Sequence, residues 1–141
     1  MRNAALEAVG ALVGTWRLTL SDAWFLEDKT PVHGTGTISW LDDAFLLFRS
    51  DLGGAGGWTI VIGRSDAREA FTALYHDERG VLRVFAMTFT GDSWTLTRED
   101  PDFHQRFVAR VEPDRIVGHW DASEDAGTTW RKDFDLTFDR A

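Results

Sequence analysis

The sequence contains no cysteine, no long apolar run and few cationic side chains. Without cysteine the chain can form no disulfide, offer no thiolate to a metal and use no cysteine nucleophile. Lys and Arg total 15 against 23 Asp and Glu, a formal net charge of −8, and such a surface repels nucleic-acid phosphates and anionic membranes. No segment approaches the ~20 apolar residues that span a bilayer, and Glu7 interrupts the apolar N-terminus, unlike a signal peptide. We therefore expect a cytoplasmic protein without nucleic-acid or membrane partners.

Tyrosine is also scarce, with one residue, whereas there are seven Trp and ten Phe. A large aromatic side chain buries about 150–250 Å² when it enters a core. A chain of 141 residues is long enough to bury roughly 70% of the surface that its unfolded form exposes. We expect residues 1–141 to form one domain whose interior is either filled with rings or lined by them around a ligand.

Turn-forming residues recur about every 10–13 positions, close to the spacing that is typical of all-β sandwiches and barrels. Between the turns, apolar and polar residues alternate with a period of two, the pattern of half-buried strands. The expected strands number about ten and lie near residues 15–22, 34–41, 44–52, 57–64, 70–76, 81–90, 93–99, 103–111, 115–122 and 128–139. Consecutive hairpins make an antiparallel meander, which we expect to close into a barrel because closure removes the exposed edges.

One segment departs from this alternation. Between Asn3 and Val13, Leu6 and Val9 share one side of a helix with Val13, so we expect one short N-terminal helix before the first strand. In the last strand, Trp130, Lys132 and Phe134 are expected on the inward phase and Asp133 on the outward phase.

Gly14-Thr15-Trp16, at the junction of this helix and the first strand, resembles the Gly-x-Trp start of calycin barrels: lipocalins, fatty-acid-binding proteins and nitrobindins. The resemblance implies that Trp16 plugs the closed end of the barrel. It also implies that a basic residue near the end of the last strand, Arg140 or less favourably Arg131, packs across the Trp16 ring.

The segment from Ser123 to Trp130 resembles the Asp-box hairpin, Ser-x-Asp-x-Gly-x-Thr-Trp, of sialidase propellers. A propeller needs far more residues than this chain has, so we interpret the motif as a structural turn. In it Asp125 would accept hydrogen bonds from turn amides, Gly127 would take a positive φ, and Trp130 would anchor the next strand.

Segment 81–90 can be placed in the barrel in two ways. In one, Phe85, Met87 and Phe89 face inward and bring Arg83 with them; in the other, Leu82, Val84 and Ala86 face inward and Arg83 lies in water. We favour the first, because the second would expose three large apolar side chains together. An interior Arg83 requires a carboxylate, a water-filled cavity or an anionic ligand group, because burying an unpaired cation costs at least several kcal/mol.

We therefore predict a binding protein that encloses a small, largely apolar molecule, since ligand pockets combine apolar walls with a few placed polar groups. The polar anchors would be Arg83 and Gln105. The predicted wall consists of inward-facing side chains, mostly aromatic: Trp40, Phe48, Trp58, Tyr75, Phe85, Met87, Trp94, Phe107 and Trp120.

Two alternatives remain open. Nitrobindin-like barrels hold haem through a histidine in their C-terminal part; here this residue would be His119, although its phase is outward. His33 is the one histidine expected at the barrel mouth. The other histidines, His76 and His104, are expected to face outward. The second alternative is a small barrel enzyme, an isomerase or cyclase, in which Tyr75 or Arg83 polarises a carbonyl.

On the outward phase, several aliphatic side chains could align into an apolar stripe. If they do, we expect a homodimer that uses this stripe twice. The residues concerned are Val61, Leu74, Val84, Val108 and Val117.

Overall fold

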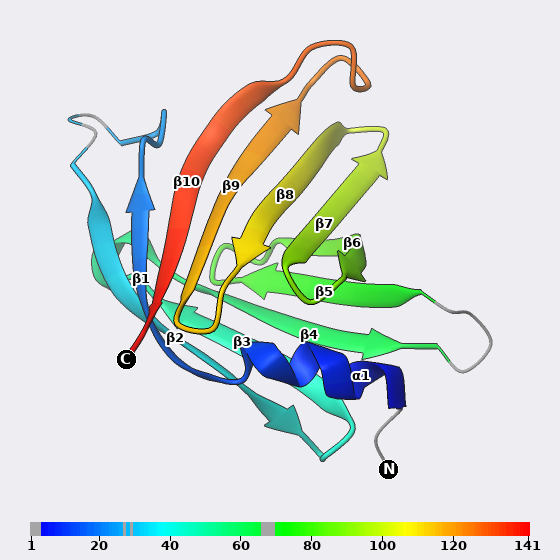
Figure 1. Ribbon diagram of the computed structural model, residues 1–141. Helices are drawn as coiled ribbons and strands as arrows, with labels where there is room; N and C mark the ends of the chain where they lie inside the picture. The colour runs from blue at the N-terminus through cyan, green and yellow to red at the C-terminus, as the bar shows by residue number, and fades with distance from the viewer. Residues whose placement is uncertain (1–3, 27, 29, 66–69) are drawn as a thin grey trace.

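A computed structural model describes residues 4–26, 28, 30–65 and 70–141. Its ten strands form a closed antiparallel barrel in which each strand pairs with its neighbours in sequence and β1 pairs with β10 (Figure 1). The expected all-β meander is thus confirmed. The strands are β1 (Gly14–Ser21), β2 (Val32–Leu41), β3 (Phe45–Asp51), β4 (Trp58–Arg64), β5 (Phe71–Asp77), β6 (Leu82–Phe89), β7 (Ser93–Asp100), β8 (Phe103–Val111), β9 (Arg115–Ser123) and β10 (Arg131–Arg140).

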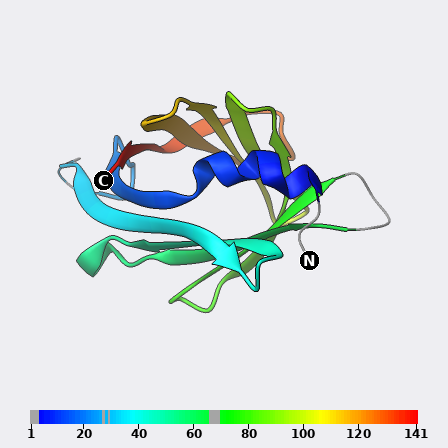
Figure 2. The ribbon, with the colours of Figure 1, turned by 60° about the horizontal axis from the view of Figure 1, so that its bottom comes forward.

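The N-terminal helix α1 (Ala4–Val9) continues into a 3₁₀ turn, η1 (Gly10–Leu12). One short N-terminal helix is confirmed; Asn3 lies outside the described residues, and Val13, expected on the helix, is extended and follows the 3₁₀ turn. Leu6, Val9 and Leu12 are almost completely buried, and in Figure 2 the helix lies across one end of the barrel. None of the described helices is long and apolar enough to cross a membrane.

Trp16 and Arg140 secure this closed end. The fully buried Trp16 donates its indole N–H to the carbonyl of Leu12 at 2.9 Å. The Arg140 guanidinium lies 4.1 Å from the Trp16 ring centroid and donates to the carbonyls of Val13 and Pro113 at 3.0 Å. Gly14 has φ 153°, and a Cβ there would come within 2.3 Å of Arg140 Nη1, so a larger residue would displace the guanidinium from this position. The expected contact of Arg140 with Trp16 is confirmed.

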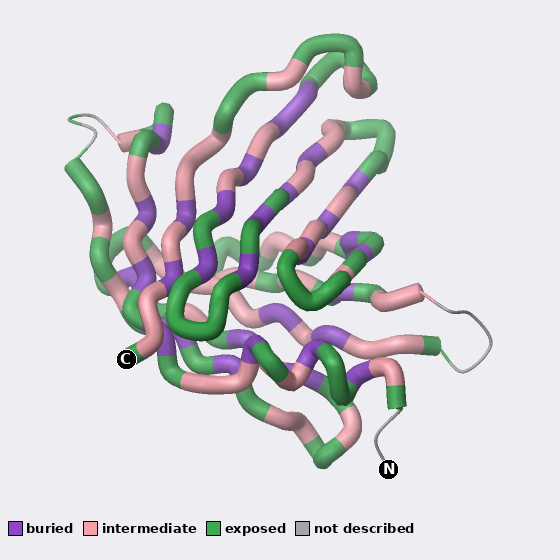
Figure 3. The backbone as a smooth tube through the Cα atoms, viewed as in Figure 1, coloured by how far each residue is buried: buried purple, intermediate pink, exposed green. Residues whose placement is uncertain are grey.

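The half of the barrel next to the helix is filled by aromatic side chains. The Trp94 and Phe107 rings meet edge to face at 5.2 Å, and Phe48 and Phe138 lie 5.5 Å apart. All four are buried, and buried positions alternate along the strands in Figure 3. This half is therefore a packed core, so any space inside the barrel must lie toward its other end.

The start of β10 differs from the expected alternation. The pairing of β10 with β9 shifts register between Lys132 and Phe134, as at a β-bulge. A bulge adds one residue and reverses the phase of what precedes it. Lys132 is therefore exposed, with its Nζ 3.2 Å from carboxylate oxygens of Asp22 and Asp135. The inward placement of Lys132 was wrong for this reason.

Trp130 was also wrongly placed inside. It precedes the first residue of β10, and its ring stacks on the guanidinium of Arg106 at 4.0 Å. Arg106 itself is on the outward phase of β8, 3.3 Å from Asp121. Trp130 thus covers the outside of the barrel beside β8.

The hairpin between β9 and β10 has the expected Asp-box geometry. Asp125 accepts hydrogen bonds from the Thr129 amide and the Ser123 hydroxyl, both at 2.8 Å, and from the Thr129 hydroxyl. These hydrogen bonds lower the pKa of Asp125 to about 2, and the bond from the Thr129 hydroxyl has the largest effect. Gly127 has φ 85°. The motif is a structural turn.

The five outward aliphatic residues do not form one stripe. Val61 lies opposite Leu74, and Leu74 lies opposite Val84, so these three are side by side on β4, β5 and β6. Val108 instead faces Thr95 and His119 across its strand pairs, and Val117 faces Arg110 and Thr137. Because each strand pair has its own register, residues of the same phase lie at different heights on the barrel.

Candidate functional site

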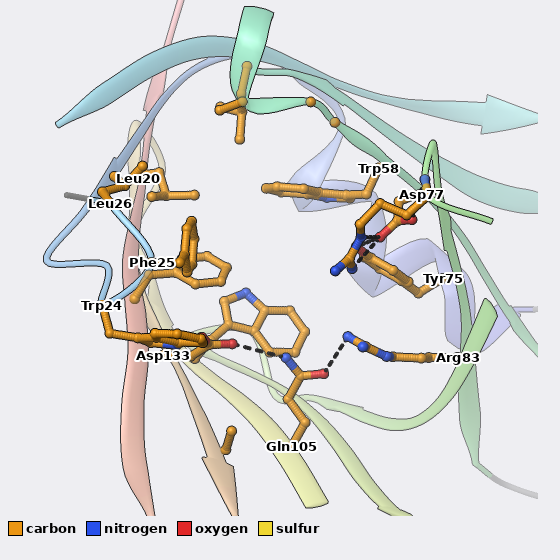
Figure 4. A pocket seen from close by; sticks show the side chains of 18 of the residues that line it. Leu20, Trp24, Phe25, Leu26, Trp58, Tyr75, Asp77, Arg83, Gln105 and Asp133 are labelled. Carbon is orange, nitrogen blue, oxygen red and sulfur yellow. Dashed lines mark hydrogen bonds and ion pairs between the residues drawn. The ribbon is translucent and has the colours of Figure 1, made fainter. Parts of the chain in front are cut away.

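A cavity of about 610 Å³ opens at the end of the barrel opposite α1 (Figure 4). In an antiparallel meander alternate connections lie at the same end, so the turns after β1, β3, β5, β7 and β9 surround the mouth. The apolar lining comes from these turns and from the halves of the strands next to them: Leu20, Trp24, Phe25, Leu26, Leu52, Ala55, Trp58, Phe85, Phe103, Trp120, Ala122 and Phe134.

The structure brings six of the eleven predicted site residues together around this cavity. They are the two predicted polar anchors and four of the predicted wall residues: Arg83, Gln105, Trp58, Tyr75, Phe85 and Trp120. The ring of Phe85 contacts those of Trp120 and Tyr75, at centroid distances of 5.5 and 6.3 Å. These contacts fix the orientation of the wall.

The other five predicted wall residues do not line the cavity. Phe48, Met87, Trp94 and Phe107 are buried in the core. Trp40 packs against the helical segment, where a Cβ on Gly10 would lie 3.1 Å from its ring. Their inward phase was correct, but alternation identifies the face of a strand and not the depth along the barrel at which a side chain lies.

The loop between β1 and β2 supplies cavity residues that the sequence analysis missed. Trp24 and Phe25 are 58% and 46% exposed, and both line the mouth. Phe25 meets Phe134 edge to face at 5.9 Å, and the Trp24 indole donates to Asp133 Oδ1 at 2.7 Å. Loop residues show no alternation of apolar and polar side chains. Two adjacent large aromatic residues between predicted strands are nevertheless unusual, and they could have indicated that this loop lines the cavity.

The structure confirms the inward phase of Arg83. Its neighbours Leu82 and Val84 are 64% and 53% exposed, whereas Phe85 is buried. The Arg83 guanidinium lies 4.6 Å from the centroid of the Phe103 ring and donates to Gln105 Oε1 at 3.3 Å.

A chain of hydrogen bonds runs along one side of the cavity from this point. Gln105 donates through Nε2 to Asp133 Oδ2 at 3.4 Å, and Asp133 in turn accepts from the Trp24 indole. Figure 4 shows Arg83, Gln105, Asp133 and Trp24 along one side of the cavity. Asp133, expected to face outward, reaches this position because of the bulge in β10.

A second polar group lies at the rim. The Tyr75 hydroxyl donates to Asp77 Oδ2 at 2.6 Å, and Arg79 Nη2 donates to the same oxygen at 2.6 Å. Burial, together with the ionised Asp77, raises the pKa of Tyr75 to about 12. Burial of Asp77 acts to raise its pKa, but the hydrogen bonds from Arg79 and Tyr75 outweigh it and lower the pKa to about 2. At neutral pH Tyr75 is therefore neutral and Asp77 is charged.

The four histidines lie away from the described cavity lining. His33, expected at the mouth, lies on the exposed face of β2, with Nδ1 3.3 Å from the Thr19 hydroxyl. His119 is 43% exposed, and its Nε2 lies 3.5 Å from Asp121. Among the described residues, no three His, Asp or Glu side chains converge as they would around a metal ion.

Comparison with known proteins identifies the fold. No protein-family model and no curated protein sequence matches this chain. Among solved structures, the crystal structure of Rv2717c from M. tuberculosis is similar, with a TM-score of 0.64 and 13% sequence identity over 100% of this chain and 99% of that chain. At this level of identity the similarity is one of fold, and it extends over the whole of the barrel.

Proposed function

We propose that this protein binds a small, largely apolar ligand in the cavity at the open end of its barrel. The observation that carries the proposal is the cavity of about 610 Å³ itself, in whose walls rings and aliphatic side chains outnumber the charged and polar side chains. Ligand pockets of proteins have this composition and volumes of about 300–1,000 Å³.

The construction of the cavity favours binding. Trp24, Phe25 and Trp58 present apolar surface to water at the cavity, and covering such surface contributes about 25 cal/mol per Å². Ring contacts fix the cavity wall, among them Phe48 with Trp58 at 5.9 Å and Phe85 with Trp120 at 5.5 Å. A wall that is already ordered loses little conformational entropy when a ligand enters.

We further propose that the barrel is of the calycin type. The Gly14-Thr15-Trp16 start, the preceding helix and the contact of Arg140 with Trp16 support this relationship. It agrees with a binding role, because the helix end of such a barrel is closed and the ligand occupies the other half.

The proposal is tested by titrating the protein with 1-decanol, a neutral apolar probe, and following tryptophan fluorescence and heat. Saturable binding of one molecule per chain is expected. Ala122 lines the cavity, so Ala122→Phe should fill part of it and weaken binding about tenfold or more, because the ring occupies ligand space.

Ala86→Phe is the matched control, since Ala86 is exposed on the outer face of β6. It should bind decanol as the wild type does. Absence of saturable binding to the wild-type protein, or equal binding by Ala122→Phe, contradicts the proposal.

A further inference from the structure

Strands β4, β5 and β6 lie side by side in Figure 1 and present an outer surface without Asp, Glu, Lys or Arg. All residues of these strands are described, and 27% of the whole chain is charged, so the absence is notable. His76 is the one titratable side chain of this surface. We call it the β4–β6 face, and its residues are Thr59, Val61, Gly63, Thr72, Leu74, His76, Leu82, Val84, Ala86 and Thr88.

Aliphatic side chains occupy the centre of the β4–β6 face. Strand register places Val61 opposite Leu74, and Leu74 opposite Val84. Leu47 of β3 lies opposite Val61, so the four residues form one row across four strands. Leu82, two residues before Val84 on the same side of β6, is 64% exposed, and Val84 is 53% exposed. Single exposed aliphatic residues are normal on a monomer, but several adjacent ones are typical of a partner surface.

The extent of the face is that of a weak interface. Neighbouring strands lie about 4.8 Å apart, and outward residues follow one another at about 6.7 Å along a strand, so each covers roughly 32 Å² of the sheet. The β4–β6 face with Leu47 and Phe45, whose ring lies beside Gly63, therefore covers roughly 400 Å². Two such faces in contact bury roughly 800 Å², within the range of transient complexes, which lies below about 1,200 Å².

The charge of the chain points to a second copy as the partner. The formal net charge is −8, so two copies repel each other unless the surfaces in contact lack carboxylates or pair them with cations. The β4–β6 face meets the first condition; charged outward residues stand on the flanking strands, Arg49 on β3 and Glu99 on β7. A cationic partner would find no carboxylate on this face, whereas it would find them on β10, at Asp135 and Asp139.

We propose that the protein forms a weak symmetric dimer in which the β4–β6 face of one copy packs on the same face of the other. A two-fold dimer is the commonest way for one surface to be used twice. From the buried area we expect a dissociation constant of about 1–100 μM. The residues of these strands that line the cavity, Trp58, Tyr75 and Phe85, project from the opposite side of the sheet, so the dimer leaves the ligand site unchanged.

Sedimentation equilibrium of the full chain from about 1 to 500 μM tests the proposal, and wild type should show a monomer–dimer equilibrium in this range. Raising NaCl from about 50 to 500 mM should strengthen the dimer severalfold, because salt screens the repulsion between the two net charges. The β4–β6 face has no ion pair that salt could weaken.

Two substitutions locate the contact. Val84→Glu and Leu74→Glu each place an unpaired charge in the interface and should weaken the dimer about tenfold or more. Val117→Glu is the matched control, since Val117 is 42% exposed on the outer face of β9, away from the β4–β6 face. It should dimerise as the wild type does. A urea-unfolding midpoint near that of wild type shows that each variant is folded.

Three results would overturn the proposal. The first is a wild-type chain that stays monomeric at about 500 μM. The second is a dimer that Val84→Glu and Leu74→Glu leave intact, or that Val117→Glu weakens equally, because its contact lies elsewhere. The third is a dimer that dissociates as salt rises, because its interface consists of ion pairs. None of these results depends on decanol binding, so the dimer and the proposed function fail separately.

Discussion

The guanidinium of Arg140, the last residue of β10, lies 4.1 Å from the ring of Trp16 near the start of β1. The same guanidinium donates to three backbone carbonyls, those of Ala11, Val13 and Pro113. One side chain thereby joins the N-terminal turn, the first strand and the β8–β9 turn at the closed end of the barrel.

Arg140→Ala should lower the free energy of unfolding by about 2 kcal/mol, since it removes the cation–π contact and leaves the partly buried carbonyl of Val13 unpaired. Urea denaturation measures this change. Arg110→Ala, at an exposed site, is the control and should stay within about 0.5 kcal/mol of wild type. Equal stability of the two variants would show that the closed end does not depend on Arg140.

The single tyrosine of the chain permits a direct test of the rim. Titration of phenolate absorbance reports Tyr75 alone, and its pKa should be about 12 in the folded protein. Asp77→Asn removes the neighbouring charge and should lower this pKa, though not to 10.0, because burial still raises it. An unchanged midpoint in Asp77→Asn would contradict the hydrogen bond between the two side chains.

The same shift makes stability depend on pH. The folded pKa of Tyr75 lies above its ordinary value of 10.0, so the folded state favours the neutral phenol. Its contribution to stability is fully present below pH 10 and is lost as the pH rises from about 10 toward 12. Denaturant unfolding of wild type and Tyr75→Phe across this range should show a steeper loss in wild type; parallel curves would contradict the shift.

The β1–β2 loop should affect binding more than folding. Phe25 lines the mouth and is 46% exposed, so Phe25→Ala should weaken decanol binding about tenfold while changing stability by about 1 kcal/mol or less. Phe45 is similarly exposed, at 42%, but does not line the cavity, and Phe45→Ala is the matched control. If both variants bind decanol like wild type, this loop does not contribute to the site.

Much of the fold could be predicted because apolar and polar residues alternate regularly in most strands. In β6 the choice between Arg83 and Val84 as the inward residue was decided correctly by the cost of exposing Phe85 and Met87. Depth along the barrel was not predictable in this way: Gln105 and Phe107 share one phase of β8, yet the first lines the cavity and the second fills the core. That difference depends on the register of all ten strands together.

Two further parts of the site carry no periodic signal. The bulge between Lys132 and Phe134 reverses the phase of the residues before it and turns Asp133 inward. Trp24 and Arg79 reach the cavity from turns, whose conformation is set by local hydrogen bonds such as that from the Arg79 amide to Asp77 at 2.9 Å. Neither feature follows from a pattern of apolar residues.

The central claim is that a ligand occupies the open half of the barrel, and the indole N–H resonances of the tryptophans test it most directly. Trp24, Trp58 and Trp120 line the cavity, whereas Trp16 and Trp94 are buried in the closed half. Titration with 1-decanol, followed by NMR, should shift the first three signals in a saturable way and leave those of Trp16 and Trp94 in place. Saturable shifts confined to Trp16 and Trp94, or none at any of the five, would contradict the account.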